Sequence, residues 1–243
     1  MHVEGPLMAG VDFALPASAA RHAQVLRLQP GDPLTLFDGS GQDWPGEVLS
    51  MGRSEVLVRI GAPVAVDHRE LPFAVTLAIG MPANERMDWL VEKATELGAV
   101  AIQPLVCERA VLRVQGERAE RKQAHWQAVA TSAAEQCGRA RVPLLLPVLG
   151  LMPWLRTLPC AGDGRFVLSL TGGSERFLNA LRAVPPNQQS GVCCLSGPEG
   201  GLSLSEEAAA RAAGFRAVTL GPRVLRAETA PLAVLAALAA LFD

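Results

Sequence analysis

The chain of 243 residues is 49% hydrophobic with a mean hydropathy of +0.23, and its formal charge is only −2 with an isoelectric point near 6.1. This composition predicts a folded globular protein and excludes long disordered segments. The near-neutral charge also excludes a global basic field for nucleic acid, so any RNA site must be local.

Several other classes of protein are excluded by the cysteine pattern and by the distribution of apolar residues. The five cysteines form no Cys-x-x-Cys pair, so they predict neither a disulfide framework nor a zinc site, and a reduced cytoplasm fits best. The first residues lack the basic and apolar segments of a secretory signal. The apolar run 230–242 is 13 residues long and so falls short of the roughly 20 residues that a membrane-crossing helix needs, and we interpret it as a core or interface helix. All 22 basic residues except Lys93 and Lys122 are arginines, a bias that suits phosphate binding and that a GC-rich genome also produces.

The first part of the chain, residues 1–68, predicts a small β-barrel. Residues 17–22 predict one helical turn, and apolar runs follow at 24–28, 33–37, 44–49 and 55–60, separated by turns rich in glycine and proline. We expect five or six strands from this spacing. Residues 62–72, with Pro63 and Pro72 around a charged centre, predict a linker.

From residue 73 onward, strands alternate with helices. Strands are predicted at 73–80, 100–106, 165–170, 191–196 and 215–220, and helices at 85–97, 117–137, 174–184, 204–213 and 231–241. Gly98 and Gly138 are expected to end helices, and Ser203 with Glu206 predicts a capping box. Residues 73–243 are therefore predicted to form an α/β domain with a mainly parallel sheet covered on both faces.

Two turns in this domain follow predicted strands, at the edge of a parallel sheet where ligands bind. Residues 196–201 read Ser-Gly-Pro-Glu-Gly-Gly, in which the glycines let the backbone approach a ligand. The glycine spacing fits neither a Walker loop nor the dinucleotide fingerprint. Residues 220–230 read Leu-Gly-Pro-Arg-Val-Leu-Arg-Ala-Glu-Thr-Ala, where Thr229 is expected to cap the last helix. The alternative interpretation is a tight structural turn in the first case and solvated loop arginines in the second.

Together the two turns resemble the carboxyl-terminal signature of the RsmE family, the 16S ribosomal RNA uracil-N3 methyltransferases of the SPOUT superfamily. Further similarity lies in His22 with residues 25–27, in the segment 92–98 and in the segment 135–139, so it covers nearly the whole chain. Two features depart from the family pattern. The first dozen residues lack a basic and aromatic start, and Ser196 stands where the family usually has a branched apolar residue.

The resemblance implies a PUA-like barrel at 1–68, a SPOUT methyltransferase domain at 73–243 and a carboxyl-terminal trefoil knot. It also implies a cytoplasmic homodimer that acts on 16S ribosomal RNA in the 30S subunit, with neither DNA nor a membrane as partner. S-adenosylmethionine would lie among the loops at 170–173, 196–201 and 220–226. The cofactor-binding residues expected from this match are Leu170, Thr171, Gly173, Ser196, Gly197, Pro198, Glu199, Gly200, Gly201, Leu220, Gly221, Arg223, Val224, Leu225 and Thr229.

The reaction implied by the family needs a proton acceptor, because N3 of uracil loses a proton as the methyl group arrives. Arginine cannot accept that proton, so Arg226 or Arg139 is expected to stabilise the developing negative charge or to grip a phosphate. Glu199 or Glu228 is the candidate base if burial favours its protonated form, although each is equally explained as a structural carboxylate. Cys137 is interpreted as a packing residue or as part of the site lining, because N-methylation needs no covalent adduct with the enzyme.

Basic residues in two parts of the chain are candidates for RNA contact. Taken alone, the segment 109–122 is best explained as a solvated helix face, and the family match makes it a plausible phosphate-binding patch. The expected RNA-binding residues are Arg21, His22, Arg27, Arg109, Arg121, Lys122 and Arg139. A SPOUT enzyme for another RNA and a noncatalytic RNA-binding protein of the same fold are the alternative functions.

Overall fold

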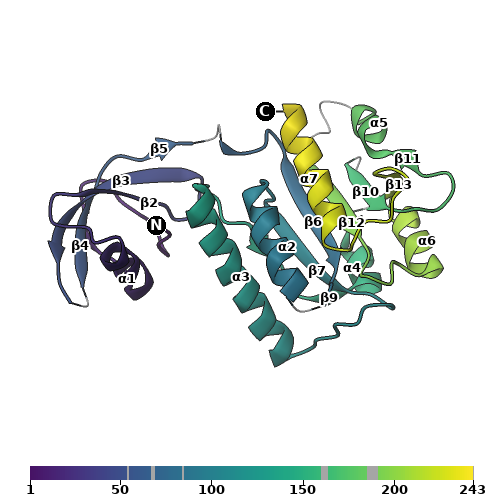
Figure 1. The fold of residues 1–243 in the computed structure, drawn as a ribbon, viewed down its shortest axis with the longest axis horizontal. Coiled ribbons are helices and arrows are strands. Elements are labelled where there is room, and N and C mark those ends of the chain that lie inside the picture. Colours follow the sequence, from purple (N-terminus) through teal and green to yellow (C-terminus); the bar gives the residue numbers. More distant parts are fainter. Residues whose placement is uncertain (54, 67–68, 84, 160–163, 185–190, 243) are drawn as a thin grey trace. The chain divides into compact units, whose positions relative to one another are not determined.

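A computed structural model describes the chain except for residues 54, 67–68, 84, 160–163, 185–190 and 243. Two compact units make up the molecule (Figure 1). Unit 1 consists of Met1–Glu70 and Ala134–Val142, and unit 2 of Leu71–Ala133 and Pro143–Asp243. Asp67 and His68, in the predicted linker, lie outside the described residues.

Unit 1 is built on a small antiparallel sheet with strand order β1-β4-β3-β2, and β5 pairs with β3. In β2 the buried side chains of Leu34 and Leu36 alternate with exposed ones, as expected for a strand with one face on a core. The alanine-rich helix α1 adds Ala19, Ala20 and Ala23 to that core. The elements are β1 (Asp12–Ala14), α1 (Ala17–Val25), β2 (Pro33–Leu36), β3 (Gln42–Met51), β4 (Val56–Ile60) and β5 (Val64–Ala65).

Two expectations for unit 1 are wrong. The predicted strand at 24–28 does not form, because α1 continues to Val25 and Arg27 then ends it in the left-handed conformation, with φ of 58°. The linker at 62–72 contains strand β5, and Val66 is buried. The β-branched residues Val64 and Val66 favour a strand, although the prolines around them favour a linker.

Unit 2 contains a parallel sheet with strand order β11-β13-β10-β12-β6-β7-β8, and β9 pairs with β7. Helix α7 packs against α2 and against β6 and β12, whereas α6 packs against α4 and β10 (Figure 1). The strands are β6 (Ala74–Gly80), β7 (Ala101–Val106), β8 (Leu144–Leu145), β9 (Leu149–Gly150), β10 (Arg165–Leu168), β11 (Glu175–Arg176), β12 (Gly191–Ser196) and β13 (Arg216–Thr219). The helices are α2 (Glu85–Glu96), α3 (Glu117–Cys137, whose last turn belongs to unit 1), α4 (Leu151–Thr157), α5 (Phe177–Arg182), α6 (Leu204–Ala212) and α7 (Thr229–Phe242).

The predicted α/β class and the parallel sheet are confirmed, and so are several helix boundaries. Gly98 and Gly138 follow α2 and α3 with φ of 94° and 78°. Ser203 Oγ accepts from the Glu206 N–H, and Glu206 Oε2 accepts from the Ser203 N–H, so the capping box is present.

Three short elements, β8, β9 and α4, are absent from the prediction, and the predicted helix at 174–184 is a two-residue strand followed by α5. Strands of two residues are too short to produce a detectable period. Within the described ranges, no helix is both long and apolar enough to cross a membrane, and no group of side chains is suited to hold a metal ion.

Candidate functional site

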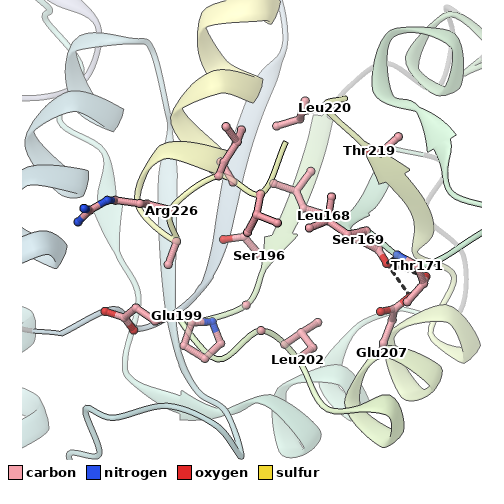
Figure 2. A pocket seen from close by; sticks show the side chains of 18 of the residues that line it. Leu168, Ser169, Thr171, Ser196, Glu199, Leu202, Glu207, Thr219, Leu220 and Arg226 are labelled. Atoms are coloured by element: carbon pink, nitrogen blue, oxygen red, sulfur yellow. Dashed lines mark hydrogen bonds between the residues drawn. The ribbon is translucent and has the colours of Figure 1, made fainter. Parts of the chain in front are cut away.

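A cavity of about 770 Å³ lies in unit 2, where β10, β12 and β13 end side by side. Its wall comes from the ends of these strands and the segments that follow them, together with Glu207 of α6 (Figure 2). Arg86 of α2 also lines it. Since parallel neighbours end at one edge of a sheet, three loops that are distant in sequence meet there. The volume falls in the usual range for sites that bind a small molecule or cofactor.

Most residues expected to bind a cofactor line this cavity, and the structure brings all three predicted loops to it. The predicted residues in its wall are Leu170, Thr171, Ser196, Gly197, Pro198, Glu199, Gly201, Leu220, Arg223, Val224 and Leu225. Gly197 is needed for the loop after β12 to close, because a Cβ there would meet the Leu202 nitrogen at 2.7 Å.

Four of the expected cofactor residues are not in the wall: Gly173, Gly200, Gly221 and Thr229. Gly200 faces residue 109 instead, where its Cβ would meet Cβ of Arg109 at 2.9 Å. Gly221 shapes its turn, since its carbonyl accepts a hydrogen bond of 3.0 Å from Thr219 Oγ1 at the end of β13. Thr229 is the first residue of α7, so it lies inside the helix that it was expected to cap.

Ser196 is the most deeply buried polar side chain in the wall, with 2% of its surface exposed. Its Oγ is buried and has no hydrogen-bond partner among the described residues. Leaving a buried hydroxyl unpaired is costly, so a free hydroxyl in the wall of a cavity favours a ligand that carries polar atoms. The apolar side chains of Leu168 and Leu225 line the same cavity, which adds surface for an apolar or aromatic part of that ligand.

One end of the cavity carries Arg226 and Glu199 (Figure 2). Arg226 is exposed, and its guanidinium group makes no hydrogen bond or ion pair within the described part of the chain. Glu199 Oε1 accepts from the Ala83 N–H at 3.0 Å and from Arg86 Nη1 at 3.2 Å. This end therefore presents a free cation beside an anchored carboxylate.

Glu228, the other candidate base, is buried and lies outside the cavity wall. Its Oε1 is 3.9 Å from Arg86 Nε, and its Oε2 has no hydrogen-bond partner among the described residues. Arg86 thus lies between the two candidate carboxylates, Glu199 and Glu228.

Arg139, the other arginine with a candidate catalytic role, belongs to unit 1. It is 4% exposed, and its Nε donates to Glu70 Oε1 at 3.0 Å while its Nη2 donates to Glu70 Oε2. Such a two-point pair fixes the guanidinium plane. The structure therefore gives Arg139 a packing role inside unit 1 and does not place it in the wall of the cavity.

The opposite end of the cavity carries a cluster of polar groups, of which the sequence analysis identified only Thr171. Glu207 accepts hydrogen bonds from Ser169, Thr171 and Arg211. Burial alone raises the pKa of Glu207, but the bonds from Arg211, Ser169 and Thr171 outweigh it and hold the pKa below its usual value. The carboxylate is thus ionised at neutral pH.

The other wall residues missed by the sequence analysis are Arg86, Leu168, Ser169, Leu202, Val218, Thr219, Ala227 and Ala230. Most of them directly flank a predicted loop, so wider loop limits would have included them. Arg86 and Glu207 had no such signal, because each lies on a helix whose polar face looks like an ordinary solvated one.

The expected RNA-binding residues belong to both units. Arg21 and Arg27 are exposed in unit 1, and His22 Nδ1 is 3.8 Å from Glu135 Oε1. In unit 2, Arg109 and Arg121 are exposed and Lys122 is half-buried. Arg109 Nη1 donates to the Gly200 carbonyl at 3.2 Å, so this cation lies next to the loop after β12.

None of the cysteines that the structure describes supplies a nucleophile to the cavity. Burial raises the pKa of Cys193 to about 12 and also raises that of Cys194, so both thiols stay protonated at neutral pH. Cys137 is exposed near the end of α3 and is not part of the cavity wall.

The family models that match the chain describe an RNA methyltransferase domain over residues 69–239 and an RNA methyltransferase PUA domain over residues 15–61. A ribosomal RNA small subunit methyltransferase E from Synechocystis is 34% identical, over 90% of this chain and 70% of the relative.

Solved structures extend the similarity to the fold. The ribosomal RNA small subunit methyltransferase E of Neisseria gonorrhoeae, solved with bound S-adenosyl methionine, is 34% identical with a TM-score of 0.89, over 99% of this chain and 96% of that one. A putative methyltransferase from Legionella pneumophila, in complex with the same cofactor, is 32% identical with a TM-score of 0.87, again over 99% of this chain and 96% of that one.

Proposed function

Because the chain belongs to the family of ribosomal RNA small subunit methyltransferases E, we propose that it methylates N3 of a specific uridine near the 3′ end of 16S ribosomal RNA. The substrate form is the small ribosomal subunit, and the methyl donor is S-adenosylmethionine. The observation that carries the proposal is the cavity at the ends of β10, β12 and β13, whose wall carries the Ser196 hydroxyl and the Arg226 guanidinium group, both without a partner among the described residues.

The residues present fit this cofactor. S-adenosylmethionine joins a flat apolar ring system to polar and charged groups, and the cavity joins apolar side chains such as Leu168 and Leu225 to the free Ser196 hydroxyl and to Glu207. When bound, the cofactor supplies an electrophilic methyl group on a positively charged sulfur. The glycine-containing loop 196–201 and the loop 220–226 would hold it, largely through backbone groups.

We assign the reacting groups to the end of the cavity that carries Arg226 and Glu199. The N3–H bond of the uracil breaks as the N3–methyl bond forms, and the carboxylate of Glu199 accepts the proton. Negative charge that spreads onto the two carbonyl oxygens of the uracil is stabilised by Arg226, whose guanidinium group has no competing partner in the described chain. Arg86 holds Glu199 in place through the 3.2 Å contact.

Glu228 is a weaker candidate for the base because it is buried outside the cavity wall. Its position 3.9 Å from Arg86 supports a different role, in which it keeps the Arg86 side chain oriented toward Glu199.

We further propose that the cavity loops form the trefoil knot of the SPOUT fold and that residues 1–68 and 73–243 act as separate RNA-docking and catalytic domains. Exposed Arg21, Arg27, Arg109 and Arg121 are proposed to contact phosphates of the RNA. A homodimer in the cytoplasm is the proposed working form.

Methyl transfer from labelled S-adenosylmethionine to small subunits that lack their native modification tests the function. Free 16S ribosomal RNA and transfer RNA serve as comparison substrates, and the product is identified by nucleoside analysis. Label recovered as 3-methyluridine from the subunits is the expected result. Cofactor binding without label in the subunits would point to another RNA, and loss of cofactor binding as well would favour a noncatalytic RNA-binding protein.

A further inference from the structure

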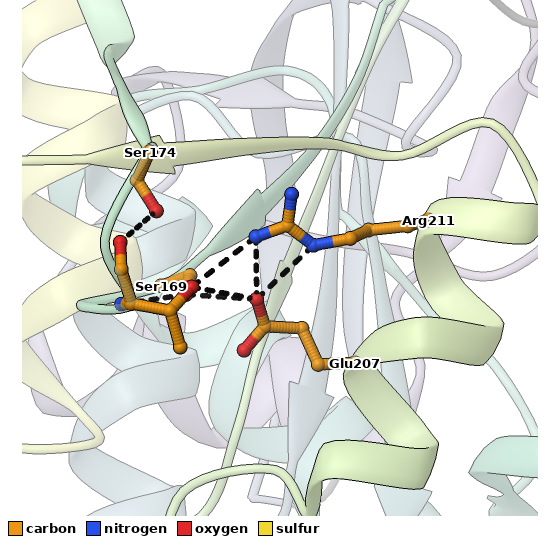
Figure 3. A network of polar contacts seen from close by, with 5 residues as sticks. Ser169, Ser174, Glu207 and Arg211 are labelled. Carbon is orange, nitrogen blue, oxygen red and sulfur yellow. Dashed lines mark hydrogen bonds and ion pairs between the residues drawn. The ribbon is translucent and has the colours of Figure 1, made fainter.

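Glu207 lies at the end of the cavity opposite Arg226, in the first turn of α6. Its Oε1 accepts from Arg211 Nη2 at 2.7 Å, from Ser169 Oγ at 3.0 Å and from Thr171 Oγ1 at 3.1 Å. Figure 3 shows these bonds converging on one of the two carboxylate oxygens. The other oxygen, Oε2, accepts no hydrogen bond within the described chain, although the side chain is only 15% exposed.

The same network holds the loop after β10 in one conformation. Ser169 Oγ accepts from the Thr171 N–H at 3.1 Å, and Ser174 Oγ donates to the Thr171 carbonyl at 2.9 Å (Figure 3). Arg211 Nη2 also donates to Thr171 Oγ1 at 3.2 Å. Oε1 of Glu207 is therefore fixed to a loop in the cavity wall. Its Oε2 is held in a defined position and has no hydrogen-bond partner among the described residues.

A carboxylate oxygen is only an acceptor, so a partner for Oε2 must carry a hydrogen-bond donor. The proposed cofactor has two strong donors outside its ring system, the α-ammonium group and the ribose diol. Charge-assisted bonds to a carboxylate are short and strong, and they select for such donors against water.

We propose that Glu207 Oε2 binds S-adenosylmethionine directly by accepting a hydrogen bond from its α-ammonium group or its ribose diol. This inference rests on the proposed function, since it assumes that the cavity takes this cofactor. It assigns to Glu207 both cofactor recognition, through Oε2, and positioning of the 169–174 loop, through Oε1.

The test is calorimetric titration of Glu207→Gln with two ligands, without any activity readout. S-adenosylmethionine carries both donors, whereas 5′-methylthioadenosine keeps the ribose diol and lacks the ammonium group. Loss of one hydrogen bond to a charged group is expected to weaken S-adenosylmethionine binding by about tenfold. If the ammonium group is the donor, binding of 5′-methylthioadenosine stays unchanged; if the diol is the donor, it weakens equally.

Two further variants separate direct binding from loop positioning. Arg211→Gln breaks the network on the Oε1 side and leaves the carboxylate, so it is expected to change affinity less than Glu207→Gln does. Glu175→Gln is the matched control, because it removes a carboxylate from the exposed 2.7 Å pair with Arg216, outside the cavity. Thermal unfolding of each variant confirms that it is folded.

Equal affinities of Glu207→Gln and the unaltered protein for both ligands would overturn the inference. So would an equal loss in Arg211→Gln and Glu207→Gln, because a purely structural network predicts that result. Failure of the unaltered protein to bind S-adenosylmethionine at all would instead refute the proposed function, so the two failures are distinguishable.

Discussion

Arginine has opposite surroundings in the two units of the molecule. In unit 1, Arg139 is buried and both oxygens of the Glu70 carboxylate accept from it. In the cavity of unit 2, Arg226 is exposed and makes no ion pair within the described residues. A guanidinium group held in a buried two-point ion pair stabilises the fold, whereas one without an ion pair is available to a substrate. Both residues are arginines, so it is the pairing of each side chain, and not the residue type, that indicates its role.

The largest expected effect of a single substitution is on stability, at Arg139. Arg139→Ala leaves the largely buried Glu70 carboxylate without its arginine partner, and breaking a buried pair in this way costs up to about 3–5 kcal/mol. Chemical denaturation followed by circular dichroism measures the loss. The control is Arg59→Ala, which removes an exposed pair with Asp12 in the same unit and is expected to change the midpoint little. Equal midpoints for the two variants would contradict the contrast between buried and exposed pairs.

Arg226→Ala is expected to act on turnover alone. Removing one group that stabilises developing charge typically lowers the rate by about 10² to 10³. Single-turnover methylation of small subunits, with the cofactor dissociation constant measured in parallel, separates the two steps. Since Arg226 has no hydrogen-bond or ion-pair partner among the described residues, the unfolding midpoint should not move. The exposed Arg182 of α5 offers a control, because Arg182→Ala removes the same charge outside the cavity. An unchanged rate in Arg226→Ala would remove the proposed role.

The Ser196 hydroxyl permits a smaller test, in which stability and binding change in opposite directions. Ser196→Ala deletes a buried hydroxyl that has no hydrogen-bond partner among the described residues, so the ligand-free protein is expected to gain up to about 1 kcal/mol of stability. The same change removes a polar contact for the cofactor, and affinity for S-adenosylmethionine should fall several-fold. Thermal unfolding with and without the cofactor measures both effects. A loss of stability in the ligand-free protein would mean that the hydroxyl is satisfied by ordered water.

The sequence was sufficient to predict the parts of the fold that have a strong period or a definite turn chemistry. The strand at 191–196, the helix at 117–137 and the capping box of Ser203 and Glu206 are confirmed. Strand β5 and the extension of α1 were missed, because a short run next to proline or alanine carries no clear period.

In the candidate site, the features that the sequence predicted are local in the chain, and those that it missed depend on contacts between distant segments. The loops after β12 and β13 were identified because glycine, proline and arginine at fixed spacing are visible in the sequence. The contributions of Arg86 and Glu207 could not be identified, since each depends on a helix packing beside a loop that is distant in the chain. The pairing of Arg139 with Glu70 joins residues 69 positions apart and was invisible for the same reason.

The smallest expected effect is the pH dependence that Glu207 contributes to stability. Because the hydrogen bonds lower the pKa of Glu207 in the folded state, the unfolded chain binds its proton at a higher pH than the folded one does. The stabilisation is therefore complete above the unfolded value of about 4.3 and is lost as the pH falls through the lower, folded value. In a plot of the unfolding midpoint against pH, this loss appears as a fall at acid pH, the acid limb. Glu207→Gln should flatten the acid limb and leave the slope near neutral pH unchanged. Arg226, at the other end of the cavity, has no such network, so Arg226→Ala should leave the acid limb as it is. An acid limb that is identical in Glu207→Gln and in the unaltered protein would mean that the carboxylate is not held as the 2.7 Å bond to Arg211 implies.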